Sequence, residues 1–286
     1  MQPEVTAFFD EATNTVTYVV IDPGSKQCAI IDPVLDYDFA SGRTATVTAD
    51  RLISYIDDNS LQLEWILETH VHADHLTAAP YIKEKLGGQI CIGSHIKSVQ
   101  EVFVKLFNIA DVAADGSQFD RLITDGDELS LGSMHIQVMH TPGHTPACNT
   151  FVVGDAAFVG DTLFMPDFGT ARCDFPGGDA AVLYQSIQKI FALPGDTRLF
   201  MCHDYKAKGR DEFAWETSVA EQREKNVHIH DGISEAEFVA FRIGRDKELG
   251  VPKLIIPSIQ INIRGGYFPA AEGNGTSYLK VPLNQL

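Results

Sequence analysis

The segment Thr69-His70-Val71-His72-Ala73-Asp74-His75 carries three imidazoles and one carboxylate within six residues. The apolar run Leu63–Leu67 before it predicts a short strand, and Leu76–Leu86 after it predicts a helix that ends at Gly87-Gly88. Histidines two residues apart on extended backbone point to the same side, and the start of a helix tolerates a carboxylate. The pattern therefore predicts a metal site at a turn from strand to helix.

Three further segments have the same placement, each directly after a predicted apolar strand. They are His140-Thr141-Pro142-Gly143-His144-Thr145, Gly160-Asp161-Thr162 and His203-Asp204-Tyr205. Each segment alone is often an ordinary turn, a helix cap or a core histidine. Together they predict that ligands from the ends of neighbouring strands converge on one site.

The strands that must position these residues are predicted from alternation of apolar and polar side chains. Residues 4–32 predict a strand followed by a hairpin with its turn at Asp22-Pro23-Gly24. Further short strands are predicted at Gln89–Gly93, at both sides of Gly132-Ser133 and at both sides of Gly154-Asp155. Strand-rich segments between single helices predict sheets covered by helices, an α/β or α+β sandwich.

The helices are predicted from capping residues before apolar stripes. Helices are expected to begin at Thr48, Ser94 and Asp179. A capping box of Ser234 and Glu237 predicts another helix that runs to about Leu249. Residues 108–120 predict an exposed loop, and the tail after Pro252 predicts short apolar stretches broken by Pro257 and glycines.

Composition bounds the class of protein. The chain has 286 residues, is 44% hydrophobic and carries a formal net charge of −17, which argues against a nucleic-acid or anionic-membrane partner. No apolar run approaches the roughly 20 residues of a membrane span, and no signal peptide is visible, so we expect a cytoplasmic protein. The five cysteines are widely spaced without a C-x-x-C, which fits buried free thiols in a reducing compartment.

Over residues 5–206 these four motifs resemble the metallo-β-lactamase superfamily. The resemblance implies a four-layer αββα sandwich with the metal at one edge between the sheets. In the binuclear zinc hydrolases of that superfamily, one metal would be held by His70, His72 and His144. The other would be held by Asp74, His75 and His203, with Asp161 bridging.

The sequence more closely resembles the persulfide dioxygenases of this superfamily. The resemblance rests on Thr145-Pro146-Ala147-Cys148, on Arg172-Cys173-Asp174-Phe175, and on the tail from Pro252-Lys253 to Asn262-Ile263-Arg264-Gly265-Gly266. Ala147 and Cys173 depart from the commoner family pattern. The family implies one Fe(II) per chain held by His70, His144 and Asp161, a set that leaves three coordination positions open for a sulfur and dioxygen. Outer groups or remnants of a second metal site would then be His72, Asp74, His75 and His203.

The expected reaction oxidises glutathione persulfide with O2 to sulfite and glutathione. Substrate contacts are expected from Arg172, Tyr205 and Arg264, with Arg245 a weaker candidate. The main alternative is a binuclear zinc hydrolase of glutathione thioesters or lactones, and a non-enzymatic sensor or scaffold is a further one. We expect a catalytic domain over residues 1–230, with a helix and extended tail over residues 231–286 packed on it. The resemblance also admits a homodimer.

Overall fold

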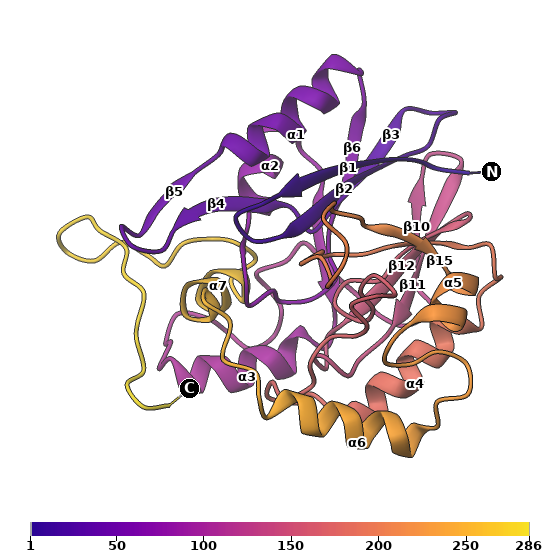
Figure 1. Cartoon of the computed structure of the whole chain (residues 1–286). Helices are drawn as coiled ribbons and strands as arrows, with labels where there is room; N and C mark the ends of the chain where they lie inside the picture. The colour runs from indigo at the N-terminus through magenta and orange to yellow at the C-terminus, as the bar shows by residue number, and fades with distance from the viewer. Residues whose placement is uncertain (1, 286) are drawn as a thin grey trace.

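The computed structural model describes residues 2–285, and its core is two six-stranded sheets that face each other (Figure 1). The first sheet has the order β1-β2-β3-β6-β8-β9. Its strands are β1 (Glu4–Asp10), β2 (Thr15–Ile21), β3 (Gln27–Ile31), β6 (Gln62–Glu68), β8 (Gln89–Gly93) and β9 (Arg121–Ile123). β1, β2 and β3 pair antiparallel, whereas β3, β6, β8 and β9 pair parallel.

The second sheet has the order β10-β11-β12-β13-β14-β15. Its strands are β10 (Glu128–Leu131), β11 (Met134–His140), β12 (Asn149–Val153), β13 (Ala156–Phe158), β14 (Arg198–Phe200) and β15 (Glu216–Ser218). β13 and β14 pair parallel and the other neighbours pair antiparallel. A small third sheet joins β4 (Val34–Asp38), β5 (Arg43–Ala45) and β7 (Leu76–Thr77).

Helices cover the outer face of each sheet. The core on the first sheet contains side chains from α1 (Val47–Asp58), α2 (Ala79–Leu86), α3 (Ile96–Leu106) and α7 (Ile255–Asn262). The core on the second sheet contains side chains from α4 (Ala180–Phe191), α5 (Val219–Lys225) and α6 (Glu235–Asp246). A third apolar core lies between the sheets and includes Tyr18, Phe151 and Phe158. These layers confirm the predicted four-layer αββα sandwich.

Both faces of the central strands are therefore buried. All seven residues of β2 are buried, because Val16, Tyr18 and Val20 face the other sheet while Val19 and Ile21 face the helices. For this reason, strands of sheets that are covered by helices have nearly continuous apolar sequences. None of the helices within residues 2–285 is long and apolar enough to cross a membrane.

Several element boundaries were predicted correctly. Asp179 accepts the N–H groups of Ala181 and Val182 at the start of α4. Ser234 and Glu237 form the predicted capping box of α6, although that helix ends at Asp246 and not near Leu249. The strand prediction at Gln89–Gly93 matches β8.

Other boundaries were predicted wrongly. The segment from Leu76 first forms β7, and the helix begins only at Ala79. Thr48 lies inside α1 and bonds Asp36 instead of capping the helix, and the predicted cap at Ser94 is replaced by His95, which makes no side-chain cap bond.

Two segments expected to be irregular are part of the packed structure. The loop over residues 108–120 is not simply exposed, because Ile109, Val112 and Phe119 are buried in the core on the first sheet. The tail forms α7 despite Pro257, which lies in the first turn, where a missing N–H costs no helical hydrogen bond.

Asp22 ties the two sheets together at one end. Its carboxylate accepts bonds from Ser25 Oγ (2.7 Å) and Gly24 N (3.0 Å) in its own turn, and from Ser133 N (2.7 Å) in the turn between β10 and β11. Burial alone would raise the pKa of Asp22, but these bonds outweigh burial and lower the pKa from 3.8 to about 2. Gly132 has φ +61°, and a Cβ there would lie 2.2 Å from the carboxylate, so this close approach requires glycine.

The first prediction concerns Asp22→Asn, which should lower the free energy of unfolding by about 1–3 kcal/mol at pH 7, because charge-assisted bonds are lost. Because the pKa of Asp22 is lower in the folded protein than in the unfolded chain, its carboxylate stabilises the fold above about pH 4. That stabilisation is lost as the pH falls through about 2. The difference in the free energy of unfolding between wild type and variant should therefore become smaller as the pH falls from 4 to 2. Urea unfolding across this range measures it, with exposed Asp58→Asn as the charge-matched control. A difference that does not change with pH would contradict the assignment.

Candidate metal centre

The turn over residues 69–75, called the metal-site turn below, is held at its first residue by a buried carboxylate that the sequence analysis did not identify. Asp32, directly after β3, accepts bonds from Thr69 N (2.7 Å) and Thr69 Oγ1 (2.8 Å) directly after β6. The backbone of Thr69 is also held from the second sheet, because Asn149 N donates to its carbonyl at 2.9 Å. The turn over residues 69–75 is thus fixed between the two sheets before any metal is considered.

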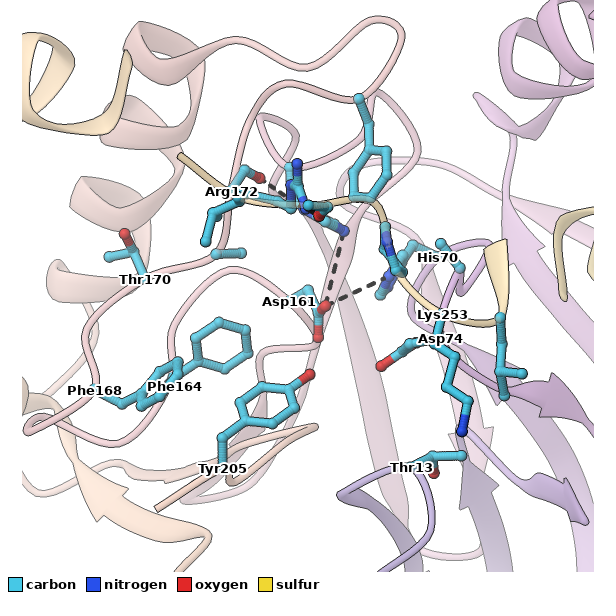
Figure 2. A pocket seen from close by; sticks show the side chains of 18 of the residues that line it. Thr13, His70, Asp74, Asp161, Phe164, Phe168, Thr170, Arg172, Tyr205 and Lys253 are labelled. Carbon is cyan, nitrogen blue, oxygen red and sulfur yellow. Dashed lines mark hydrogen bonds and ion pairs between the residues drawn. The ribbon is translucent and has the colours of Figure 1, made fainter. Parts of the chain in front are cut away.

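His70, His144 and Asp161 form one group of metal-ligand atoms that lie within 4.8 Å of one another. Asp161 Oδ2 is 4.0 Å from His70 Nε2 and 3.8 Å from His144 Nε2 (Figure 2). Both separations are shorter than twice the ~2.1 Å bond between an imidazole nitrogen and a metal ion. The three residues all line a cavity of about 650 Å³, so a metal held by them would be accessible to a substrate.

Neighbouring groups orient the two imidazoles of this group. His144 Nδ1 lies 2.8 Å from the carbonyl of Arg172, which can only accept, so Nδ1 carries the proton and Nε2 is free. The Thr69 hydroxyl donates its hydrogen to Asp32 and therefore accepts from His70 Nδ1 at 3.1 Å. Burial, together with the nearby histidines, lowers the pKa of His70 well below its usual value, which keeps the ring neutral as a ligand must be.

The glycine before His144 fixes the position of that ligand. Gly143 has φ +137°, and a Cβ there would lie 2.4 Å from the Cα of Leu183 in α4. Its carbonyl also accepts the N–H of Asp179, the cap of the same helix, at 2.9 Å. The Pro-Gly-His segment is therefore pressed against α4, and only glycine fits at this contact.

His72, Asp74, His75 and His203 form the second group within 4.8 Å. His203 Nε2 lies 3.0 Å from Asp74 Oδ2 and 3.3 Å from Asp161 Oδ1. Burial would lower the pKa of His203, but the two carboxylates outweigh burial and raise it. His203 Nδ1 is 3.2 Å from the carbonyl of Asn14, which fixes the ring with Nε2 toward the carboxylates.

The ligand pattern of the binuclear zinc hydrolases would place His72 with His70 and His144, but the structure places it elsewhere. Its Nε2 lies 3.0 Å from Asp32 Oδ1 and 3.9 Å from Glu68 Oε2, both buried carboxylates. Burial raises the pKa of Asp32, and burial together with Asp32 raises that of Glu68. Within the described residues no group of ligand atoms unites His72 with His70 and His144.

The donor atoms fit a metal ion. His72 Nε2, His75 Nε2, His203 Nε2 and Asp161 Oδ1 are buried, and none makes a hydrogen bond of acceptable geometry within residues 2–285, although His72 and His203 lie 3.0 Å from carboxylates. Buried polar atoms without partners are uncommon in folded proteins, and these four are of the kinds that ligate first-row metals. The residues present would therefore hold at least one ion.

The cavity beside the metal centre contains two of the three residues predicted to contact substrate. Tyr205 lies on one wall with Phe164 and Phe168, and its ring is 5.3 Å from that of Phe168 (Figure 2). Arg172 also lines the cavity, but its guanidinium is bound to the Asp174 carboxylate and the Gly250 carbonyl.

The structure does not bring Arg264 to this cavity. Its guanidinium binds both carboxylate oxygens of Asp111, at 2.7 and 2.8 Å. It lines a separate, smaller cavity with residues of the 111–120 loop. Arg264 therefore holds the tail against the loop instead of facing the metal ligands. The five cysteines are all buried and free, as expected, and burial raises the pKa of the Cys173 thiol, which makes it a poor nucleophile.

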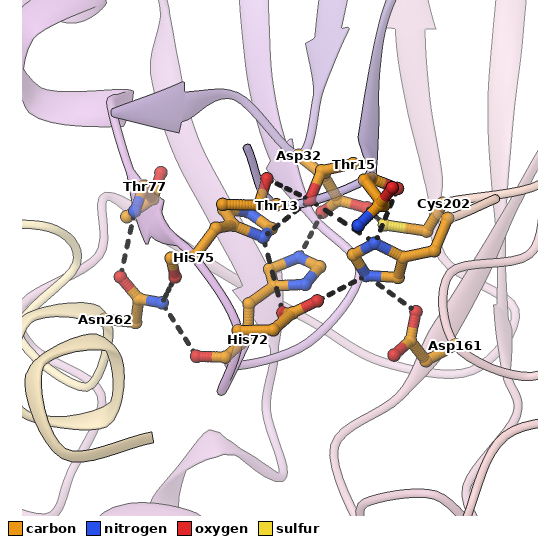
Figure 3. A network of polar contacts seen from close by, with 12 residues as sticks. Thr13, Thr15, Asp32, His72, His75, Thr77, Asp161, Cys202 and Asn262 are labelled. Carbon is orange, nitrogen blue, oxygen red and sulfur yellow. Dashed lines mark hydrogen bonds and ion pairs between the residues drawn. The ribbon is translucent and has the colours of Figure 1, made fainter. Parts of the chain in front are cut away.

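Asn262, in the last turn of α7, supports the metal-site turn from the tail. Its side-chain amide donates to the carbonyls of His72 (2.9 Å) and His75 (2.8 Å), and its oxygen accepts the N–H of Thr77 (3.0 Å) (Figure 3). Sequence analysis missed this role because the amide lies nearly 190 residues after the turn. Asp32 could have been found, because it follows a strand just as the predicted ligands do.

Comparison with known proteins places the chain in a superfamily. The model of the metallo-β-lactamase superfamily matches residues 11–203, and the chain belongs to that superfamily. It is 55% identical to a probable metallo-hydrolase of Burkholderia pseudomallei over 99% of both chains. It is 46% identical to glyoxylase B2 of Dictyostelium discoideum over 99% of this chain and 98% of that protein.

Persulfide dioxygenases are among the relatives. The chain is 34% identical to the human mitochondrial persulfide dioxygenase ETHE1 over 90% of this chain and 87% of that protein. The crystal structure of ETHE1 from Myxococcus xanthus matches with a TM-score of 0.73 and 30% identity, covering 92% of this chain and all of that one. The chain spans 65% of the length of a beta-lactamase hydrolase-like protein of Xylella fastidiosa that is 50% identical to it.

The second prediction concerns Asn262→Ala, which should lower metal affinity about 10–100-fold without unfolding the chain, because the amide orients the segment that carries four ligands. Metal content after dialysis against a graded chelator series measures the effect. Gln260→Ala is the matched control, since this buried amide of the same helix bonds Ile256 and Lys280 and not the turn. Equal losses in both variants would mean that the helix as a whole, and not Asn262, supports the metal.

Proposed function

We propose that the chain is a non-haem Fe(II) persulfide dioxygenase that oxidises glutathione persulfide. The observation that supports the proposal is the composition of the ligand group that lines the cavity. Two histidines and one carboxylate, His70, His144 and Asp161, converge at the cavity, whereas His72, which would complete a three-histidine zinc site, faces Asp32. Similarity to the human and Myxococcus xanthus ETHE1 proteins supports the same reaction.

The chain's own residues provide the surroundings that this chemistry needs. His70, His144 and Asp161 would hold an Fe(II) ion, which would supply the redox chemistry that couples oxidation of a substrate sulfur to reduction of dioxygen. His70 and His144 present their Nε2 atoms in directions that are fixed by Thr69 and the Arg172 carbonyl. Phe164 and Phe168 form an apolar wall that excludes water from the reacting sulfur.

The overall reaction balances without a further cofactor. Glutathione persulfide, O2 and water give glutathione, sulfite and two protons. The outer sulfur is oxidised, dioxygen is reduced, and the bond between the two sulfurs of the persulfide breaks. The cavity of about 650 Å³ is of the size that binds drug-sized ligands, which suits a tripeptide derivative.

A binuclear zinc hydrolase of glutathione thioesters or lactones is the second candidate. Two observations favour it. His75 Nε2 and His203 Nε2 are buried and make no hydrogen bond in the described part of the chain, and Asp161 Oδ1 lies only 3.3 Å from His203 Nε2, as a bridging carboxylate would. The relatives named metallo-hydrolase and glyoxylase B2 agree with it. Metal content separates the two functions, with one iron for the dioxygenase and two zinc ions for the hydrolase.

The third prediction compares two histidines. His144→Ala should lose iron and oxygen consumption, because a three-ligand site has no ligand to spare. His203→Ala should retain substantial iron with activity lowered about 10–100-fold, because His203 contacts the ligand Asp161 and is not itself an iron ligand in this proposal. Metal analysis of anaerobically purified protein, with an oxygen electrode and glutathione persulfide, measures both. Two zinc ions in the wild type and loss of one in His203→Ala would overturn the dioxygenase proposal.

A further inference from the structure

The cavity wall carries four cationic side chains, and two of them are already bound within the protein. Arg172 uses all three guanidinium nitrogens on Asp174 and the Gly250 carbonyl, with N–O distances of 2.5–2.6 Å. Arg242 is 2% exposed and binds Asp246 at 2.6 and 2.8 Å and the Thr170 carbonyl at 3.1 Å. A substrate carboxylate would have to displace these bonds to reach either guanidinium.

Of the other two cations, Lys253 is the better placed to bind a ligand. Arg245 lies in the last turn of α6, has a half-exposed side chain and is 3.5 Å from Glu248. Lys253 has no hydrogen bond and no ion pair within 4.0 Å among residues 2–285. Asp38 lies on the same cavity wall and its charge interacts with that of Lys253, but its Oδ1 accepts the hydroxyl and N–H of Ser41, and it is not within 4.0 Å of the Lys253 ammonium.

The position of Lys253 matches the charged end of an extended substrate. Lys253 lies on the loop between α6 and α7 and extends along the cavity on the side of Asp74 and Thr13 (Figure 2). Phe164, Phe168 and Tyr205 form the opposite side, and Asp161 of the triad lies between the two. A ligand whose sulfur lies at His70, His144 and Asp161 and whose apolar part contacts the aromatic side of the cavity would have its charged groups near Lys253.

The charge of the protein makes such a cation necessary. With a formal net charge of −17, the chain repels an anionic substrate except where a local positive charge attracts it. We propose that Lys253 is the residue that binds a carboxylate of the substrate, an assignment that rests on the proposed action on a glutathione derivative. Arg172 then acts as a positioning residue, because it fixes the Gly250 end of the loop that carries Lys253.

Binding of an unreactive ligand tests this assignment separately from turnover. The probe is S-methylglutathione, which keeps both carboxylates, and its diethyl ester, which has neither. Calorimetry on the full, metal-loaded chain should show at least about 10-fold weaker binding of S-methylglutathione to Lys253→Gln. Lys253→Arg should bind it nearly as well as the wild type, since a point charge is what the site provides. The diethyl ester should bind wild type and Lys253→Gln equally.

A charge-matched variant controls for the general field of the protein. Lys97→Gln removes the same charge from an exposed position on α3 that does not line the cavity, and it should leave binding unchanged. The assignment is overturned if Lys253→Gln binds S-methylglutathione like the wild type. It is also overturned if the substitution weakens binding of the diethyl ester as much as binding of S-methylglutathione itself. If the protein holds two zinc ions and consumes no oxygen while Lys253→Gln still loses binding, the dioxygenase proposal falls and the Lys253 assignment stands.

Discussion

The carboxylate of Asp32 is the contact on which the metal centre depends. It accepts two bonds from Thr69, lies 3.0 Å from His72 Nε2, and accepts the Cys202 thiol at 3.6 Å. It therefore joins the ends of β3 and β6 in the first sheet to the residue that precedes His203 in the second. A buried carboxylate is costly unless hydrogen bonds satisfy it, and here the bonds that satisfy it also set the position of the ligands.

This arrangement explains how one chain can present two groups of ligands with different surroundings. His70, His144 and Asp161 face an open cavity, and the orienting bonds to the two rings come from a hydroxyl and a backbone carbonyl. The Nε2 atoms of His72 and His203 instead lie 3.0 Å from carboxylates of the protein, those of Asp32 and Asp74. A second ion in that group would have to compete with those contacts, whereas the first group has open space in front of it.

The sequence marked the candidate ligands because each of them follows a strand, and strand ends are marked by local apolar patterns. The structure brings these side chains together in two groups, and their binding of a metal stays a prediction. The layers followed from the same patterns. Asn262 and Arg264 could not be placed, because their partners lie far away along the chain and no local spacing reveals them. The contact between Arg172 and Gly250 could not be foreseen for a related reason. The residue type of Arg172 suits a substrate carboxylate, but only the structure shows that Asp174 and Gly250 already bind it.

The bonds from Asn262 to the metal-site turn also bear on how the protein is made. A ribosome adds about 5–20 residues per second, so Asn262 is added about 10–40 s after His72, 190 residues earlier. During that interval the carbonyls of His72 and His75 lack the amide that later holds them. The turn acquires this support only after residue 262 has been added. A nascent chain that still lacks residue 262 therefore carries these histidines without the two bonds that hold their carbonyls in the folded protein.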